Sequence, residues 1–196
     1  MSLDPKVRFS PALEAVGVPD WCFNNLVARG DVEQLEELRE AVAGPGGALD
    51  FERVDPTPLE LAGRRLDPDG AMIAALCGAA EAEDLYAWRG ANWGCTRPAD
   101  PDSVRIEDTE EEVLSFRHST PWSPPEGIAA TLAGRFPALR IELAFFHPAR
   151  GFAGAIAFEG GAKVGREESE ECSQVRMLLE REFGMAEAAE LLDPEG

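Results

Sequence analysis

The sequence predicts an α+β fold in which helices pack mainly on one face of an antiparallel sheet. The main observation is the stretch Ser115–Gly161, which reads as strand, helix, strand, turn and strand. A strand and a helix precede this stretch near the N-terminus, and an amphipathic stripe follows it near the C-terminus. With 196 residues the chain can bury a core, and we expect one compact unit with appendages.

The first elements are a strand and a helix. Strand-forming residues fill Trp21–Arg29, and Asp31 is a typical N-cap for a helix that ends at Gly44. The segment Leu49–Val54 alternates in polarity, so it predicts a short strand that the prolines after Asp55 would stop.

An insertion follows these elements. The alanine-rich segment Ala71–Trp88 favours a helix that covers part of the domain. Ser103–Ile106 and Val113–Thr120 then predict a hairpin, whose connection is the acidic run Glu107–Glu112.

The second half of the domain has the clearest helix start. Ser123 is predicted to cap a helix that has prolines in its first turn and Glu126 at its third position, and Pro137 stops that helix. Strands are expected at Leu139–His147 and Phe152–Glu159, because apolar residues alternate with polar ones in the first and strand formers fill the second.

Three regions result from this reading. Residues 1–18 form a loose N-terminal segment, residues 19–161 form the α+β domain, and residues 162–196 form an acidic C-terminal helix and tail. The apolar stripe of that helix consists of Val175, Leu178, Leu179 and Phe183.

The net charge of −19 makes direct binding of nucleic acid unlikely, because the phosphate backbone would be repelled. No apolar run is long enough for a bilayer and the N-terminus lacks a secretion signal, so we expect a cytoplasmic protein without membrane contact. The cysteines form no CxxC pair and are expected to be free thiols, and the sequence predicts no cofactor and no metal. They are Cys22, Cys77, Cys95 and Cys172.

Four short motifs occur in an order that resembles a known family. They are Pro19–Asn25, Asn92-Trp93-Gly94, Trp122–Pro125 and Gly151–Gly154. Together they resemble the YubB-type ferredoxin-like domain family, whose uncharacterised members occur in bacteria and on plasmids and phages. The resemblance implies a ferredoxin-like α+β sandwich and no established reaction. After Gly94 the family usually has threonine, lysine and tryptophan, whereas this chain has Cys95-Thr96-Arg97-Pro98.

The expected topology places both histidines at one end of the sheet. A right-handed crossover leaves its two strands parallel, so the strand ends near His118 and His147 lie at the same end of the sheet. In the ferredoxin-like order the first strand lies between them, which brings the start of that strand, Trp21 and Cys22, to the same edge. The histidine backbones would then be on the order of 10 Å apart.

Two interpretations of this edge remain open. The first is structural: the histidines end their strands and form hydrogen bonds beneath loops. The second is a pocket for a small molecule or a metal, in which two histidines and a thiol would suit zinc. The candidate pocket residues are Trp21, Cys22, Trp93, Cys95, His118, Trp122 and His147.

The sequence favours a non-catalytic binding or interaction module whose partner is an unknown protein or small molecule, and the resemblance implies a link to mobile elements. One alternative is a metal- or thiol-dependent hydrolase or transferase at the sheet edge. The other is an acidic decoy that mimics nucleic acid through carboxylates such as those of Glu107–Glu112 and of the C-terminal region.

Overall fold

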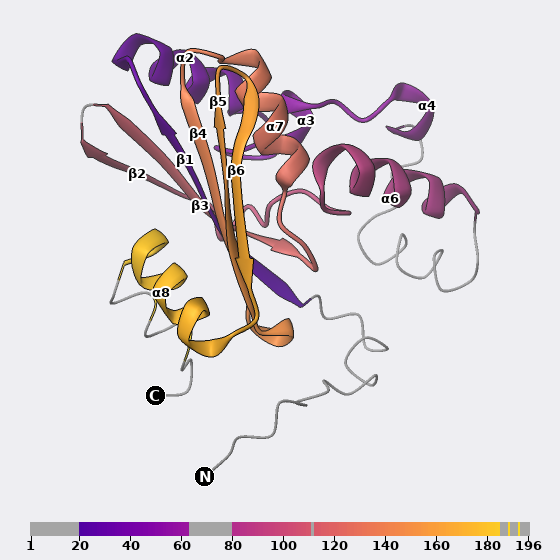
Figure 1. Cartoon of the computed structure of the whole chain (residues 1–196). Helices are drawn as coiled ribbons and strands as arrows, with labels where there is room; N and C mark the ends of the chain where they lie inside the picture. The colour runs from indigo at the N-terminus through magenta and orange to yellow at the C-terminus, as the bar shows by residue number, and fades with distance from the viewer. Residues whose placement is uncertain (1–19, 63–79, 111, 185–187, 189–191, 193–196) are drawn as a thin grey trace.

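The centre of the molecule is a six-stranded sheet with the strand order β2-β3-β1-β4-β5-β6 (Figure 1). The structure is a computed structural model that describes residues 20–62, 80–110, 112–184, 188 and 192. All neighbouring strands are antiparallel. The strands are β1 (Trp21–Arg29), β2 (Arg105–Glu110), β3 (Val113–Pro121), β4 (Arg140–His147), β5 (Phe152–Glu159) and β6 (Ala162–Ser169).

The first four strands and two helices form a ferredoxin-like βαββαβ unit. Helix α2 (Val32–Val42) follows β1, and helix α7 (Glu126–Arg135) connects β3 to β4. The predicted fold class is therefore confirmed. Strands β5 and β6 extend the sheet beyond this unit.

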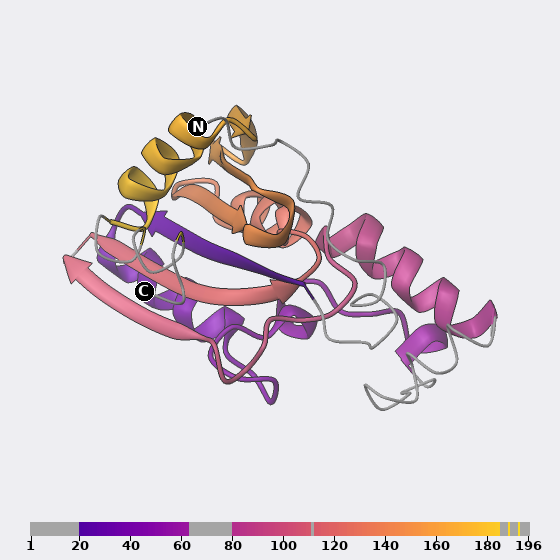
Figure 2. The same cartoon turned by 90° about the horizontal axis from the view of Figure 1, so that it is seen from below.

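Helices cover both faces of the sheet, although most lie on one face. The larger core lies between the sheet and the helices α2, α3 (Phe51–Val54) and α7, and it includes Leu38 and Ile128. Helix α8 (Cys172–Glu182) packs on the other face, as Figures 1 and 2 show. The remaining elements are α4 (Leu59–Ala62), α6 (Ala80–Trp93) and the 3-10 turn η1 (Pro148–Arg150). Within the part of the chain that the structure describes, no helix is both long and apolar enough to cross a membrane.

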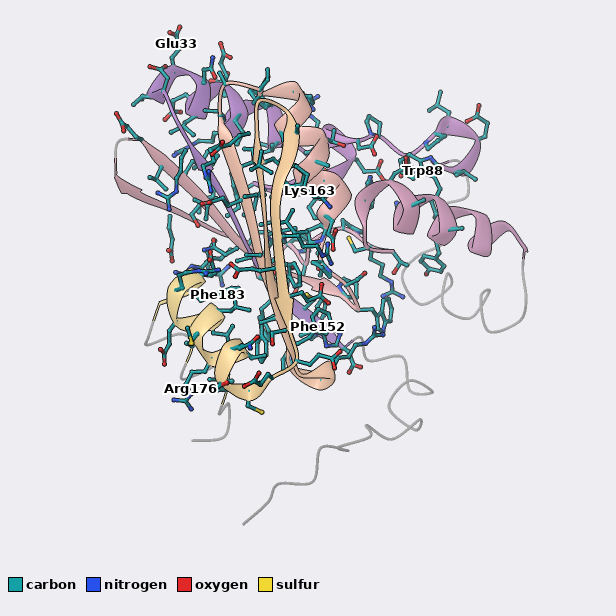
Figure 3. All side chains as sticks on the ribbon, viewed as in Figure 1. Glu33, Trp88, Phe152, Lys163, Arg176 and Phe183 are labelled. Atoms are coloured by element: carbon teal, nitrogen blue, oxygen red, sulfur yellow. The ribbon has the colours of Figure 1, made fainter. Side chains whose placement is uncertain are left out.

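Helix α8 forms a second, smaller core with β1, β4 and β5. Its predicted apolar stripe is buried against the sheet, and Phe183 just after its last turn lies beside the sheet in Figure 3. The C-terminal carbonyls of the helix accept hydrogen bonds from the sheet: Asn25 Nδ2 donates to Glu182 O at 2.9 Å, and Arg117 donates to Phe183 O at 3.4 Å. These contacts satisfy carbonyls that would otherwise lack a partner at a helix end.

Strand β6 was not predicted from the sequence, which ended the sheet at Gly161. Seven consecutive residues, 162–168, are exposed, so the strand has no buried face that would impose an alternating apolar pattern. Its pairing with β5 comes instead from the tight turn at Gly160 and Gly161, where φ is +59° and +78°.

The strand predicted at Leu49–Val54 was wrong, because Phe51–Val54 is a short helix. The Asp50 side chain caps this helix by accepting a hydrogen bond from Glu52 N at 3.0 Å. Phe51 and Val54 are buried at a spacing of three residues, which fits one helical turn. Over so short a segment, the alternating polarity fits a strand equally well.

The helix predicted at Ala71–Trp88 is described from Ala80 onward and ends at Trp93, while residues 71–79 lie outside the described residues. The predicted capping role of Ser123 was also wrong. Helix α7 starts at Glu126 without a side-chain cap, and Ser123 Oγ instead donates to Gly94 O at 2.8 Å.

Two glycines allow helix α7 to approach the end of helix α6. A Cβ atom at Gly127 would lie 1.7 Å from Asn92 O, and one at Gly94 would lie 2.7 Å from Glu126 N. Gly94 also has a φ of +87°, a conformation that a side chain disfavours. Glycine at both positions is thus required for this contact.

We expect Gly127→Ala to lower the free energy of unfolding by about 3 kcal/mol, because the added methyl group meets rigid backbone. Gly134→Ala in the same helix is the matched control. A Cβ at Gly134 meets nothing within 4 Å, so that variant should be neutral or slightly stabilised. Urea denaturation measures both, and equal stabilities of the two variants would contradict the proposed close approach.

Candidate functional site

The strand pairings bring the two histidines to the same end of the sheet, as predicted. Strand β1 pairs with β3 on one side and with β4 on the other, and Asn24 is opposite both His118 and Phe145. On β4, Phe146 is opposite Phe23, so His147 lies at the level of Cys22. The histidines therefore flank the N-terminal end of β1.

Both imidazoles are buried on the face covered by α2, α3 and α7, but each has its own neighbours. The His118 ring, which is 3% exposed, packs in a T-shaped arrangement with the Phe51 ring, and the ring centroids are 6.1 Å apart. Its Nδ1 lies 3.1 Å from Phe116 O. The His147 ring stacks on Phe152 at 5.4 Å, and its Nδ1 accepts a hydrogen bond from Arg150 N at 3.3 Å.

Burial keeps both imidazoles neutral at neutral pH. Removal from water lowers the pKa of His118 to about 4, although the carbonyl of Phe116 opposes this shift. Burial and the nearby Arg150 guanidinium lower the pKa of His147, while Asp20 and the Trp122 backbone act in the opposite direction. The Nε2 atoms of both rings are buried without a hydrogen-bond partner in the described structure.

The thiols of Cys22 and Cys95 are also sealed from solvent. Both residues are fully buried, and the Cys95 thiol donates to Arg97 O at 3.1 Å. Burial raises the pKa of Cys95 to about 12. Burial and then the nearby Cys95 raise the pKa of Cys22 far above its usual range. Thiols in this state are poor nucleophiles, since nucleophilic attack requires the thiolate.

Asn24 connects these groups, and the sequence analysis did not single it out. Its Nδ2 donates to Cys22 O and to Thr120 Oγ1, both at 2.9 Å, and lies 3.4 Å from His118 O. The signal that could have found it is its parity: Asn24 falls on the same face of β1 as Cys22 and Leu26, where apolar residues are expected.

The three tryptophans of the predicted pocket lie in different environments. Trp93 is fully buried between Phe51 and Trp88, and its Nε1 donates to Asp55 O at 2.8 Å. Trp21 is 36% exposed and lies on the opposite face of β1 from Cys22.

The third tryptophan, Trp122, has a strained backbone. Its φ of +64° is left-handed, and its N–H donates to Asp20 O at 2.7 Å. The guanidinium of Arg97 lies over its ring at 5.4 Å. The rim of the sheet thus gathers aromatic side chains around buried polar groups, but the three indoles do not share one environment.

No metal centre is evident at this rim. Among the described residues, no group of three or more histidine, cysteine, aspartate or glutamate side chains could hold a metal ion. The histidines and cysteines are near one end of the sheet, yet they make separate contacts within the core.

A second candidate site, not predicted from the sequence, lies on the face that carries α8. It is a cleft of about 590 Å³ between the C-terminal end of α8 and strands β4–β6. Its charged walls are paired, for example Arg29 with Glu142 at 3.4 Å and Arg181 with Glu167. The lining residues are Arg29, Arg140, Glu142, Ala155, Ile156, Ala157, Gly165, Arg166, Glu167, Arg181 and Glu182.

Comparisons with known proteins agree on the fold. Residues 103–189 match the model of a family described as a ferredoxin-like domain in Api92-like protein. This part of the chain is therefore similar in sequence to that ferredoxin-like domain. The match covers less than half of the sequence, and the narrower YubB-type assignment stays a prediction.

A solved structure is similar over a larger part of the chain. The crystal structure of protein api92 from Yersinia pseudotuberculosis superposes with a TM-score of 0.52 at 11% sequence identity, covering 78% of this chain and 98% of that chain. At this identity the similarity concerns the fold alone. A search of curated proteins finds no match to this sequence.

The thiol environments predict selective reactivity. In a Cys77→Ser background, Cys172 should react rapidly with a thiol reagent because it is exposed, whereas Cys22 and Cys95 should react only as the protein unfolds. Peptide mapping after timed labelling measures each rate. Rapid native-state labelling of Cys22 or Cys95 would show that the rim opens to solvent.

The pKa of His118 predicts acid sensitivity. The folded state lowers this pKa below its unfolded value of 6.5, so the stabilisation is complete above pH 6.5 and is lost as the pH falls toward about 4. The loss should be about 1.4 kcal/mol per pH unit within this window. Urea denaturation at a series of pH values gives the free energy of unfolding as a function of pH. Between pH 6.5 and about 4 this free energy should fall less steeply in His118→Gln than in the wild type, and identical pH dependences would contradict the assigned environment.

Proposed function

We propose that this chain is a non-catalytic interaction module that binds another protein through its charged outer surface. The supporting observation is the burial of the groups most suited to chemistry: His118, Cys22 and Cys95 are each at most 3% exposed. Each is also held neutral by its surroundings. A substrate could not touch these groups without opening the core, whereas the surface charges are accessible.

Helix α2 offers a surface for a basic partner. Its outer side carries a row of exposed carboxylates, of which Glu33 projects outward in Figure 3. The basic residue of this helix, Arg39, lies 3.9 Å from Glu36 and offsets only one of these charges. Such a row attracts a basic surface and speeds its association. The carboxylates are those of Asp31, Glu33, Glu36, Glu37 and Glu40.

The same row supports a second candidate function, an acidic decoy that occupies a nucleic-acid-binding protein. A line of carboxylates on one helix and the net charge of −19 give this chain the sign of a nucleic acid. An association with plasmids or phages, which the YubB-type resemblance implies, would suit a decoy and stays a prediction.

The enzyme alternative, a metal- or thiol-dependent hydrolase or transferase, has less support. It requires the rim to open and the thiols to ionise, against the burial that raises their pKa values. Turnover of any substrate that is abolished by His118→Ala or His147→Ala would favour this alternative over the interaction module.

We expect a captured partner to be basic and its binding to weaken strongly between about 50 mM and about 500 mM salt, because salt screens exposed charges. The triple variant Glu33→Gln, Glu37→Gln, Glu40→Gln should lose at least about tenfold in affinity. The matched control Glu60→Gln, Asp102→Asn, Glu180→Gln changes the net charge equally but leaves α2 intact. Titration of the purified partner measures both, and equal losses in the two variants would contradict a role for α2.

A further inference from the structure

We propose that the free edge of β6 binds an extended, basic segment of a partner protein as a seventh strand of the sheet. This inference rests on the proposed function and assigns it a second contact surface. The addition of a strand to an exposed sheet edge is a common mode of peptide recognition, in which backbone hydrogen bonds supply much of the affinity.

Strand β6 is the better of the two sheet edges for such pairing. It has one neighbour, β5, so half of its backbone N–H and C=O groups point away from the sheet. Its pairing is continuous from Gly165 to Ser169, opposite Ala157 to Ala153. In Figure 1 β6 lies in front of the other strands of the sheet.

The other edge, β2, is less regular. Its register with β3 shifts between Asp108 and Glu110, within a strand of six residues. Such an irregularity twists an edge and hinders strand addition. In β6 the corresponding shift lies near the turn, opposite Ala157 and Phe158, and leaves the second half of the strand uninterrupted.

The cleft on the α8 face lies directly beside this edge. Gly165 of β6 lines the cleft, and a Cβ at this position would meet nothing within 4 Å. A long side chain on an added strand could therefore pass over Gly165. There it would meet the carboxylates of Glu142, Glu167 and Glu182, and it would compete with the arginines that pair with them, Arg29, Arg140 and Arg181.

Charge favours a basic partner over a second copy of this chain. A second copy would also carry a net charge of −19, and the two molecules would repel each other. Four glutamates occupy the five positions 167–171, at the end of β6 and just beyond it. Of the two cations of β6, Arg166 pairs with Glu126 of α7 and with Glu168, and Lys163 lies 4.0 Å from Glu126.

The test uses the full chain and a synthetic octapeptide in which lysine alternates with valine or threonine. We expect the peptide to slow hydrogen exchange at β6 backbone amides within 165–169 by at least about tenfold. A second peptide of the same sequence, with alternate backbone nitrogens methylated, keeps the charge but cannot complete the hydrogen bonds. It should bind at least about tenfold more weakly.

Variants separate the edge from general electrostatics. Gly165→Leu keeps the strand but obstructs the way into the cleft, and it should weaken peptide binding at least about fivefold. The control Gly134→Ala should bind as the wild type does. The Gln triple variant of α2 should retain the peptide-induced protection of β6.

Two results would overturn the proposal. Equal binding of the methylated and unmethylated peptides would show that charge alone attracts the peptide, and would leave the proposed function intact. Protection of β6 that rises with protein concentration without peptide would show that a second copy occupies the edge. Failure of the proposed function is distinguishable, because it is measured by the loss of the captured partner in the α2 variant.

Discussion

The pairing of β1 with a strand on each side is the constraint on which the rest of the structure depends. The two registers of β1 place Asn24 between His118 and Phe145 and fix the end of the sheet where both histidines lie. The Asn24 amide strengthens this arrangement, since it donates within β1 and across to Thr120 of β3. Once these registers are set, the crossover helix α7 must pack where glycines at 94 and 127 permit a close approach.

The same pairing explains why the residues that could act as nucleophiles, acids or bases are buried in the core. Cys22, Asn24, His118 and His147 all fall on the face covered by α2, α3 and α7, where burial favours the uncharged form of each titratable group. Charge is accordingly concentrated outside, on α2, on β6 and around the cleft beside α8. The structure thus combines a neutral core with an acidic surface.

Elements with a buried face could be predicted from the sequence, because burial imposes a period. Strand β4 and the stripe of α8 were found in this way, whereas β1 was predicted from its strand-forming residues and α7 from the prolines and Glu126 at its start. The common end of the two histidines followed from crossover geometry. Strand β6 lacks a buried face and left no pattern. The short helix at Phe51–Val54 is too brief for its period to differ from that of a strand.

The separate surroundings of the site residues could not be predicted, since they depend on which loops cover the sheet end. The alternation of side chains along the strands predicted that His118 and His147 lie on one face. It did not predict that Phe51 packs against the His118 ring or that Phe152 stacks on the His147 ring. The cleft was missed because it forms between α8 and β4–β6, whose positions relative to each other depend on the unpredicted strand β6.

The most direct test of the neutral core is an NMR titration of the two imidazoles in the folded protein. The account predicts that His118 stays neutral from pH 8 down to about pH 5, since its pKa is about 4. The pKa of His147 should also be below the ordinary value of 6.5. Titration of His118 near pH 6.5 would show a solvent-accessible ring and would contradict the claim that the residues at this rim are sealed within the core.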